Sequence, residues 1–234
     1  MEQQNSFRKV VGWLTIISVP FAFTNFALMA IAGSDSQDVS DFYYFLKAGE
    51  EAGYLMKWSW LADLLGYYLL LVPAAFFMYY WLKNKNPYWM GVFSFCGLAY
   101  IFAGCIGAAI LAKTWPTLIS GYANTNGITK EIYSIVFTNS TEMVYGGIWG
   151  YLEFLLAGIW WIGVGFTMKS ERKALGIITI ILGIFTLATV VGEVFTLEYI
   201  ALAGLMIYLL LAPIWAGWLG ISLVRGKDMQ LANP

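Results

Sequence analysis

Residues Ala174–Phe195 read ALGIITIILGIFTLATVVGEVF, an apolar run whose one charged residue, Glu193, comes close to its end. A helix of about 20 such residues crosses the roughly 30 Å of hydrocarbon in a lipid bilayer. Lipid is a favourable environment for these apolar side chains, whereas a soluble domain of this size would have to bury them all away from water. The stretch is therefore predicted to be a transmembrane helix.

Five more apolar runs of similar length follow the same pattern: Val10–Ala32, Trp58–Leu82, Tyr88–Ala112, Val144–Met168 and Tyr199–Val224. The whole chain of 234 residues is 60% hydrophobic and only 12% charged, where soluble domains carry about 25% charge. We predict an all-α membrane helix bundle of about six transmembrane helices, forming one domain over residues 1–234. The first run exceeds the apolar region of a typical signal peptide, so it is predicted to be a retained helix.

Basic residues are unevenly divided between the two ends of the predicted helices. Cytoplasmic loops carry the excess of lysine and arginine in membrane proteins, and an even number of spans returns the chain to the side where it began. Both termini are therefore predicted to be cytoplasmic. The cytoplasmic set is Arg8, Lys9, Lys83, Lys85, Lys169, Arg172, Lys173, Arg225 and Lys227, against Lys47, Lys57, Lys113 and Lys130 outside.

Two long outer loops are predicted, at Gly33–Lys57 and Lys113–Met143. The first mixes acids with aromatic residues, which is typical of a short helix lying at the membrane surface. The second contains the turn formers Asn124 and Asn126 and a short helical stretch at about Thr129–Phe137. Because the inner connections are short, any function carried by loops is expected to face outward.

Three acids lie within or at the end of predicted spans: Asp63, Glu153 and Glu193. Ionisable residues inside a bilayer are costly and usually have a function, and no lysine or arginine lies at comparable depth. One interpretation is a polar cavity, open to the outside, that binds a cation, a proton or a small amphipathic ligand. The other is that the acids are neutral, hydrogen-bonded packing residues, since polar side chains often join membrane helices.

The neighbours of these acids refine the first interpretation. Gly146 and Gly150 share a helical face with Glu153, and small residues mark packed faces in membranes, so Glu153 is expected to point into the bundle. Tyr67 and Trp149 lie at similar depth, and their rings attract cations. Prolines inside three runs predict kinks, which either create cavities or accommodate neighbouring helices: Pro20, Pro73 and Pro213.

The sequence lacks the residues that several kinds of catalysis and ligand binding require. The chain has no histidine, which removes the usual general base and most metal ligands. Cys96 and Cys105 fall on different faces of one helix, too far apart for a disulfide, and are predicted to be inert thiols. The net charge of −1 gives no basic field for nucleic acid. We therefore predict no enzymatic activity, no cofactor, no metal site and no nucleic-acid partner.

Three short patterns carry a resemblance to a known family. They are RKVVG at 8–12, NPYW at 86–89, and IWAGWLGI at 214–221 ahead of Arg225. With the six-run layout, the chain resembles a family of six-helix bacterial integral membrane proteins of unknown function. The resemblance implies a multi-pass protein of the bacterial inner membrane. It implies no activity and no roles for particular residues.

Two functions fit these observations. The first is a non-catalytic subunit or scaffold of a membrane complex, whose partners are lipid and either other membrane subunits or further copies of the chain. The alternative is a small transporter or binding protein that uses Asp63, Glu153 and Glu193 in an acidic, aromatic cavity. Replacing the acids by their amides would separate the two, since only the second function depends on the carboxyl groups.

Overall fold

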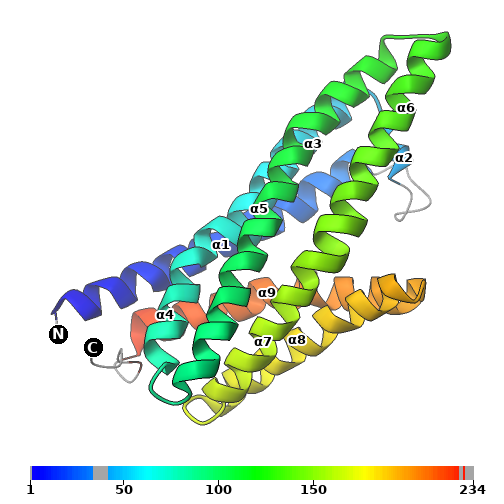
Figure 1. The fold of residues 1–234 in the computed structure, drawn as a ribbon. Coiled ribbons are helices and arrows are strands. Elements are labelled where there is room, and N and C mark those ends of the chain that lie inside the picture. The colour runs from blue at the N-terminus through cyan, green and yellow to red at the C-terminus, as the bar shows by residue number, and fades with distance from the viewer. Residues whose placement is uncertain (1, 34–41, 227–228, 230–234) are drawn as a thin grey trace.

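The structure is a computed structural model that describes residues 2–33, 42–226 and 229, and all regular structure in these residues is helical (Figure 1). Within them, six helices are long and apolar enough to cross a membrane. The prediction of an all-α, multi-pass membrane bundle with about six spans is confirmed. Cys96 and Cys105 are free thiols, as predicted.

The elements follow one another with short connections. In chain order they are α1 (Glu2–Ala32), α2 (Tyr43–Lys47), α3 (Glu50–Asp63), η1 (Leu64–Tyr68), η2 (Leu69–Leu71), α4 (Val72–Leu82), α5 (Pro87–Ala123), α6 (Gly127–Glu142), η3 (Met143–Glu153), α7 (Phe154–Met168), α8 (Lys173–Val194) and α9 (Glu198–Arg225). Two chain segments are continuous rods built from several elements: α3 to α4, and α6 through η3 to α7. The single long helix α5 forms a third rod. In Figure 1 the start of α1 and the end of α9 lie at the end of the bundle that also holds the α4–α5 and α7–α8 turns.

The predicted outer loop Lys113–Met143 is corrected by the structure. Helix α5 continues to Ala123, and α6 begins at Gly127 after a short turn in which Gly127 has a φ of 59°. The expected short helix at 129–137 is the middle of α6. Hydropathy marks only the part of a helix that lipid surrounds. Here the two helices pack on each other beyond that part, and this packing keeps them helical in water.

The predicted outer loop Gly33–Lys57 is shorter than expected, because α3 already begins at Glu50. The expected interfacial helix corresponds to α2, but its Phe45 and Leu46 are buried. The hydroxyl groups of Tyr43 and Tyr122 are 3.4 Å apart, so α2 packs against α5 inside the protein. Residues 34–41, which carry three of the acids of this segment, lie outside the described residues.

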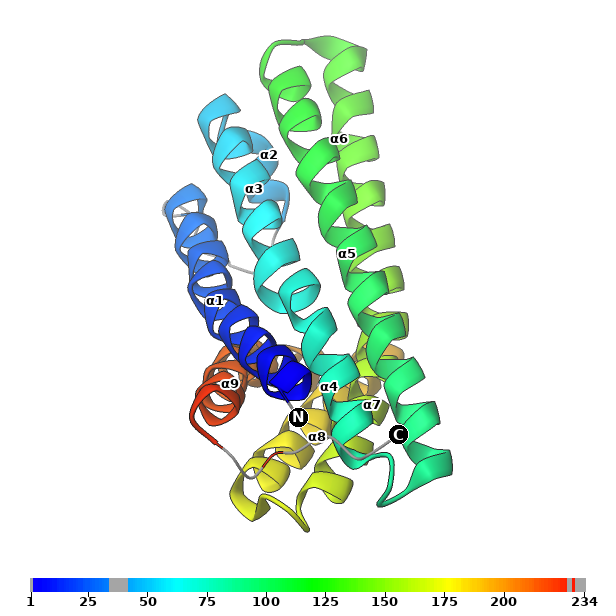
Figure 2. The ribbon, with the colours of Figure 1, turned by 90° about the vertical axis from the view of Figure 1, so that its left-hand side faces the viewer.

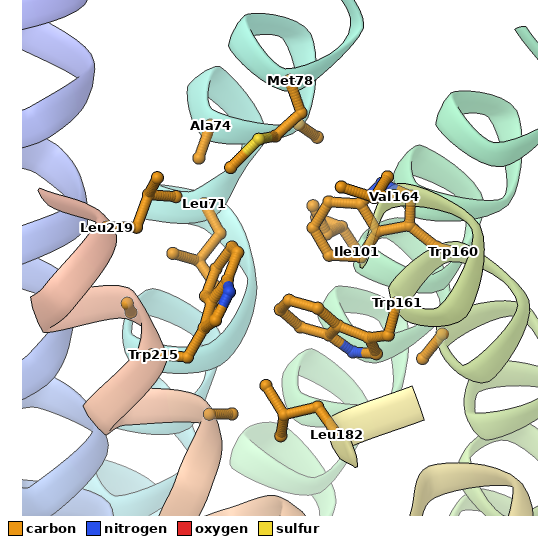
Figure 3. Packing of buried hydrophobic residues seen from close by; sticks show 14 of the residues in the cluster. Leu71, Ala74, Met78, Ile101, Trp160, Trp161, Val164, Leu182, Trp215 and Leu219 are labelled. Atoms are coloured by element: carbon orange, nitrogen blue, oxygen red, sulfur yellow. The ribbon is translucent and has the colours of Figure 1, made fainter. Parts of the chain in front are cut away.

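Close helix contacts shape the half of the bundle that holds the start of α1 and the end of α9. A Cβ atom on Gly12 would lie 2.9 Å from the carbonyl oxygen of Gly220, so α1 and α9 cross with their backbones nearly touching. Next to this crossing, the rings of Trp161 and Trp215 are 4.4 Å apart and nearly perpendicular, and Trp160 packs beside them (Figure 3). These buried tryptophans form the core between α7 and α9.

The outer half is less compact. Figure 2 shows that α8 and α9 lie at a large angle to α3, α5 and α6, so the two groups of helices diverge toward the outer end. The acids predicted from the sequence lie near the point where the groups separate, since Asp63 ends α3 and Glu153 precedes α7.

Candidate functional site

Asp63 and Glu153 each adjoin a stretch of π-helix. Asp63 is the residue before η1, and Glu153 is the last residue of η3. A π-helical turn holds more residues than an α-helical turn, distorts the helix locally, and occurs frequently at functional sites. Both intramembrane acids of this pair are therefore carried by irregular helix, in two segments that are far apart in the sequence.

The sequence around each acid explains the irregular backbone. Pro73 lacks a backbone N–H and its ring clashes with the carbonyl group four residues earlier, at Leu69. The chain accommodates this with η1 and the 3₁₀ turn η2 directly before Pro73. The second segment, η3, contains the glycines at positions 146, 147 and 150, which lower the preference for a regular α-helix.

Both acids are buried without a basic partner. Glu153 has no accessible surface and Asp63 only 6%. Both carboxyl oxygens of Glu153 and the Oδ2 atom of Asp63 lack a hydrogen-bond partner among the described residues. An ion pair among the described residues joins Lys85 to Glu171, 2.6 Å apart. It lies in the turns that follow α4 and α7 and does not involve either buried acid. A buried charge without a partner is costly, so the pair requires a proton or a cation.

Asp63 acts electrostatically on Glu153. The charge of Asp63 is felt at the Glu153 carboxyl group, and no described lysine or arginine contributes at either acid. Two like charges within electrostatic range of each other are costly to keep together in a low-dielectric interior. The pair is thus a place where the gain or loss of one proton changes the electrostatic energy strongly.

A group of tyrosines surrounds the pair. The hydroxyl group of Tyr67 donates a 2.8 Å hydrogen bond to the carbonyl oxygen of Leu209. The hydroxyl group of Tyr68 approaches the Glu153 carboxyl group but does not reach hydrogen-bonding geometry. The tyrosines within electrostatic range of one or both acids are Tyr67, Tyr68, Tyr100, Tyr145 and Tyr208.

Three aromatic residues that lie within about two helical turns of the acids in the sequence pack on one another, and the name aromatic roof is used for them: Trp60, Tyr145 and Trp149. Their ring centres are 4.9 Å apart for Tyr145 and Trp149, and 5.7 Å apart for Trp60 and Trp149. Glu153 is fully buried and Asp63 nearly so. In this structure both acids are therefore enclosed, and an opening to the outside stays a prediction.

The structure separates the predicted site residues into two groups. Asp63, Glu153 and Tyr67 lie together, and Trp149 belongs to the aromatic roof. Glu193 lies elsewhere: it is half-buried at the outer end of α8, within electrostatic range of Glu142.

The two glycines predicted for helix packing differ in their surroundings. A Cβ atom on Gly150 would lie 3.5 Å from the Glu193 side chain, so this glycine faces α8. A Cβ atom on Gly146 would meet only the side chain of Glu142, one turn earlier on the same rod. Gly150 thus lies at a helix contact within the chain, and Gly146 does not.

Sequence reasoning missed Tyr68, Tyr100 and Tyr208. These tyrosines come from three separate helices, and Tyr100 and Tyr208 have no other predicted site residue close to them in the sequence. The available signal was their position inside the predicted apolar spans, where a tyrosine hydroxyl group seeks a polar partner. Tyr68 directly follows the predicted Tyr67, but a regular helix would have turned it away from the same face.

The polar residues of α1 and α8 form hydrogen bonds within and between helices and do not belong to the acid site. Asn25 donates to the carbonyl oxygen and the hydroxyl group of Ser59, at 3.1 and 3.0 Å, and Ser59 returns a bond to Asn25. Thr186 bonds to the carbonyl oxygen of Leu182 on its own helix. Hydroxyl and amide groups here join helices or satisfy their own backbone, as the second interpretation of the polar residues predicts.

The arrangement supports proton chemistry better than metal chemistry. Among the described residues no group of three or more histidine, cysteine, aspartate or glutamate side chains could hold a metal ion. Two carboxyl groups with a ring of hydroxyl groups can bind, share and release a proton.

Comparison of the chain with protein-family models, with curated proteins and with solved structures finds no match. The resemblance to six-helix bacterial membrane proteins therefore stays a prediction. Any function has to be argued from the residues and their geometry.

Proposed function

We propose that this multi-pass membrane protein is a proton-linked transporter in which Asp63 and Glu153 form the proton-binding site. The single observation that carries the proposal is the pair itself: two fully or nearly fully buried acids, within electrostatic range of each other, without a basic partner in the part of the chain that the structure describes. A role in helix packing alone does not explain such a pair, because apolar residues of the same volume would stabilise the bundle more.

A proton suits this pair better than a metal cation. A proton needs only one carboxyl oxygen, and both Asp63 and Glu153 have carboxyl oxygens without a hydrogen-bond partner among the described residues. Calcium requires six to eight oxygen ligands and magnesium a nearly octahedral set. The surroundings of the pair are largely aromatic rings, whose faces attract a cation but do not replace its water ligands.

Transport also requires access from each side in turn. Glu153 and Asp63 are buried in this structure, which corresponds to an enclosed state. The helix irregularities at η1 and η3 lie directly beside the acids. Irregular segments with two discrete arrangements are where helical rods bend when transporters change state. Movement at η3 would carry the Tyr145 and Trp149 rings with it, since both belong to that segment.

The test is proton flux into liposomes that contain the purified protein and a pH-sensitive dye, driven by an imposed membrane potential. The parent protein is expected to acidify the interior faster than empty liposomes, and Glu153→Gln or Asp63→Asn to abolish the difference. Glu193→Gln is the matched control, because Glu193 lies outside the pair, and it is expected to retain the flux. Flux that survives both amide variants would contradict the proposal, as would the absence of flux in the parent.

A second candidate function is that of a non-catalytic subunit or scaffold of a membrane complex. It is favoured by the α5–α6 hairpin, which extends past the α8–α9 turn (Figure 1), and by the exposed apolar residues on α6. Its test is purification in a mild detergent with identification of the co-purifying chains. A stoichiometric partner that is retained by the Glu153→Gln variant, together with absent proton flux, favours this function over transport.

A further inference from the structure

The α5–α6 hairpin is longer than a membrane crossing requires. Helix α5 has 37 residues, about 55 Å at 1.5 Å per residue, although about 20 residues suffice to cross the hydrocarbon. The outer end of α8 is taken as the level of the membrane surface, and Glu193 at this end lies within electrostatic range of Glu142, the last residue of α6. All 16 residues of α6, about 24 Å of helix, therefore continue outward from that level.

One face of this projecting helix is apolar and uncovered. Ile128, Ile132, Ile135 and Met143 have exposed fractions of 76, 54, 60 and 70%, and Val136 beside them is also exposed. The name outer stripe is used for these five residues. The opposite face of the rod is covered by the chain itself: Phe137, Thr141 and Val144 are buried. Contiguous apolar patches in water mark sites of protein interaction.

The spacing of the outer stripe identifies the kind of partner. Ile128, Ile132, Ile135 and Asn139 follow one another at intervals of four, three and four residues, the pattern of a coiled-coil seam, which packs against another helix. Asn139 is exposed and occupies a seam position equivalent to that of Ile132. A single asparagine at such a position specifies register and oligomer state when it meets the same asparagine of a second helix.

The same face continues toward the membrane with an open glycine. Gly147 is exposed, lies one turn beyond Met143, and has no atom within 4 Å of where its Cβ would be. A glycine on the outer surface of a membrane helix allows a second helix to approach closely. The seam above the membrane and the small residue at its edge thus lie on one side of the same rod.

We infer that the protein forms a homodimer in which the outer stripe and Asn139 of one copy pack against the same residues of a second copy. Copies in one membrane share an orientation, so a two-fold axis along the membrane normal brings their α6 helices together in parallel. In that arrangement Ile132 and Ile135 meet their counterparts and the two Asn139 side chains pair. A short seam suffices because the bilayer already confines both copies to one plane and one orientation.

The experiment is disulfide crosslinking of the full chain in native membranes, in a Cys96→Ala and Cys105→Ala background. Ile135→Cys is expected to give an oxidised dimer that reductant reverses. Thr117→Cys is the matched control, because Thr117 is exposed on the other helix of the hairpin and away from the outer stripe, and it is expected to stay monomeric. Crosslinking at both positions to the same extent indicates random collision and overturns the inference.

A second measurement does not depend on crosslinking. The parent protein in nanodiscs or mild detergent is expected to have twice the mass of the Ile132→Asp, Ile135→Asp double variant. Because both residues are exposed within one copy, the variant is expected to keep the helical content of the parent. A monomeric parent, or a parent that occurs only with a different protein on this face, overturns the inference. The dimer is independent of the proton site, so loss of either finding leaves the other standing.

Discussion

Asp63 and Glu153 come from different helical rods, each at the edge of a π-helical segment, and their carboxyl groups lie within electrostatic range of each other inside the bundle. Neither finds a basic partner among the described residues, and the Tyr68 hydroxyl group is the polar group that approaches Glu153. Such an arrangement sacrifices stability, which natural proteins typically do at functional sites. The predictions below test the pair and the packing that holds it in place.

The protonated state of the pair can be probed with dicyclohexylcarbodiimide, an apolar reagent that modifies protonated carboxyl groups. We expect modification of Glu153 or Asp63, decreasing as the pH of the medium rises, because only the protonated acid reacts. Mass spectrometry of peptides locates the adduct. The exposed Glu198 serves as the internal control, since it lies outside the pair and faces solvent, and it should stay unmodified. Labelling spread evenly over the exposed acids would argue against a protonated pair.

Replacing Glu153 by glutamine is expected to leave the melting temperature unchanged or to raise it. The amide keeps the shape of the side chain and removes the possibility of a buried, unpaired negative charge. Thermal unfolding in detergent, followed by tryptophan fluorescence, measures the effect. A marked decrease in melting temperature would mean that the carboxyl group has a structural role, and the proton site would then lose its main support.

The contact between η1 and α1 can be tested at Gly66. A Cβ atom at this position would lie 2.4 Å from the backbone nitrogen of Ala22, and the backbone cannot rotate away as a side chain could. Gly66→Ala is expected to destabilise the bundle by about 1–3 kcal/mol or more. Gly91→Ala is the control, with nothing within 4 Å of its Cβ, and should stabilise helix α5 by about 0.5–1 kcal/mol. Equal effects of the two substitutions would contradict the close contact.

The hydrogen bond between α9 and α8 gives a fourth test. The indole nitrogen of Trp215 donates to the Thr179 hydroxyl group at 2.8 Å, in a fully buried setting (Figure 3 shows the position of Trp215). Thr179→Val leaves the indole N–H unpaired and is expected to cost about 1–3 kcal/mol of unfolding free energy. Thr186→Val is the control, because the Thr186 hydroxyl group bonds only to its own helix, at Leu182. It should cost well below 1 kcal/mol; a comparable loss would refute the assignment.

Much of the fold could be read from the sequence because lipid imposes a simple rule. A run such as Ala174–Phe195 must be a helix in a membrane, since no other local structure satisfies its backbone there, and the observed α8 matches it within a few residues. The same rule failed beyond the membrane. Residues 113–143 look like a loop by hydropathy, yet contacts between α5 and α6 keep most of them helical.

The site was only partly accessible to the same reasoning. Helical periodicity correctly turned Glu153 inward, because a carboxyl group is excluded from lipid. Whether it meets Asp63 or Glu193 depends on how the rods cross and bend, and periodicity within one helix carries no information on that. The structure places Asp63 beside Glu153 and leaves Glu193 at the outer end of α8. The π-helical segments arise from the packing of Pro73 and the glycines of η3 in their surroundings.

By itself, the amino-acid sequence determined that this chain is a bundle of about six membrane-spanning helices bearing unpaired acids, because composition and run length decide which solvent a segment tolerates. Only the tertiary structure decided that Asp63 and Glu153 lie within electrostatic range of each other, that both are enclosed, and that α6 presents an uncovered apolar face. Each of these depends on the relative placement of separate helices, and that placement results from contacts among residues far apart in the chain.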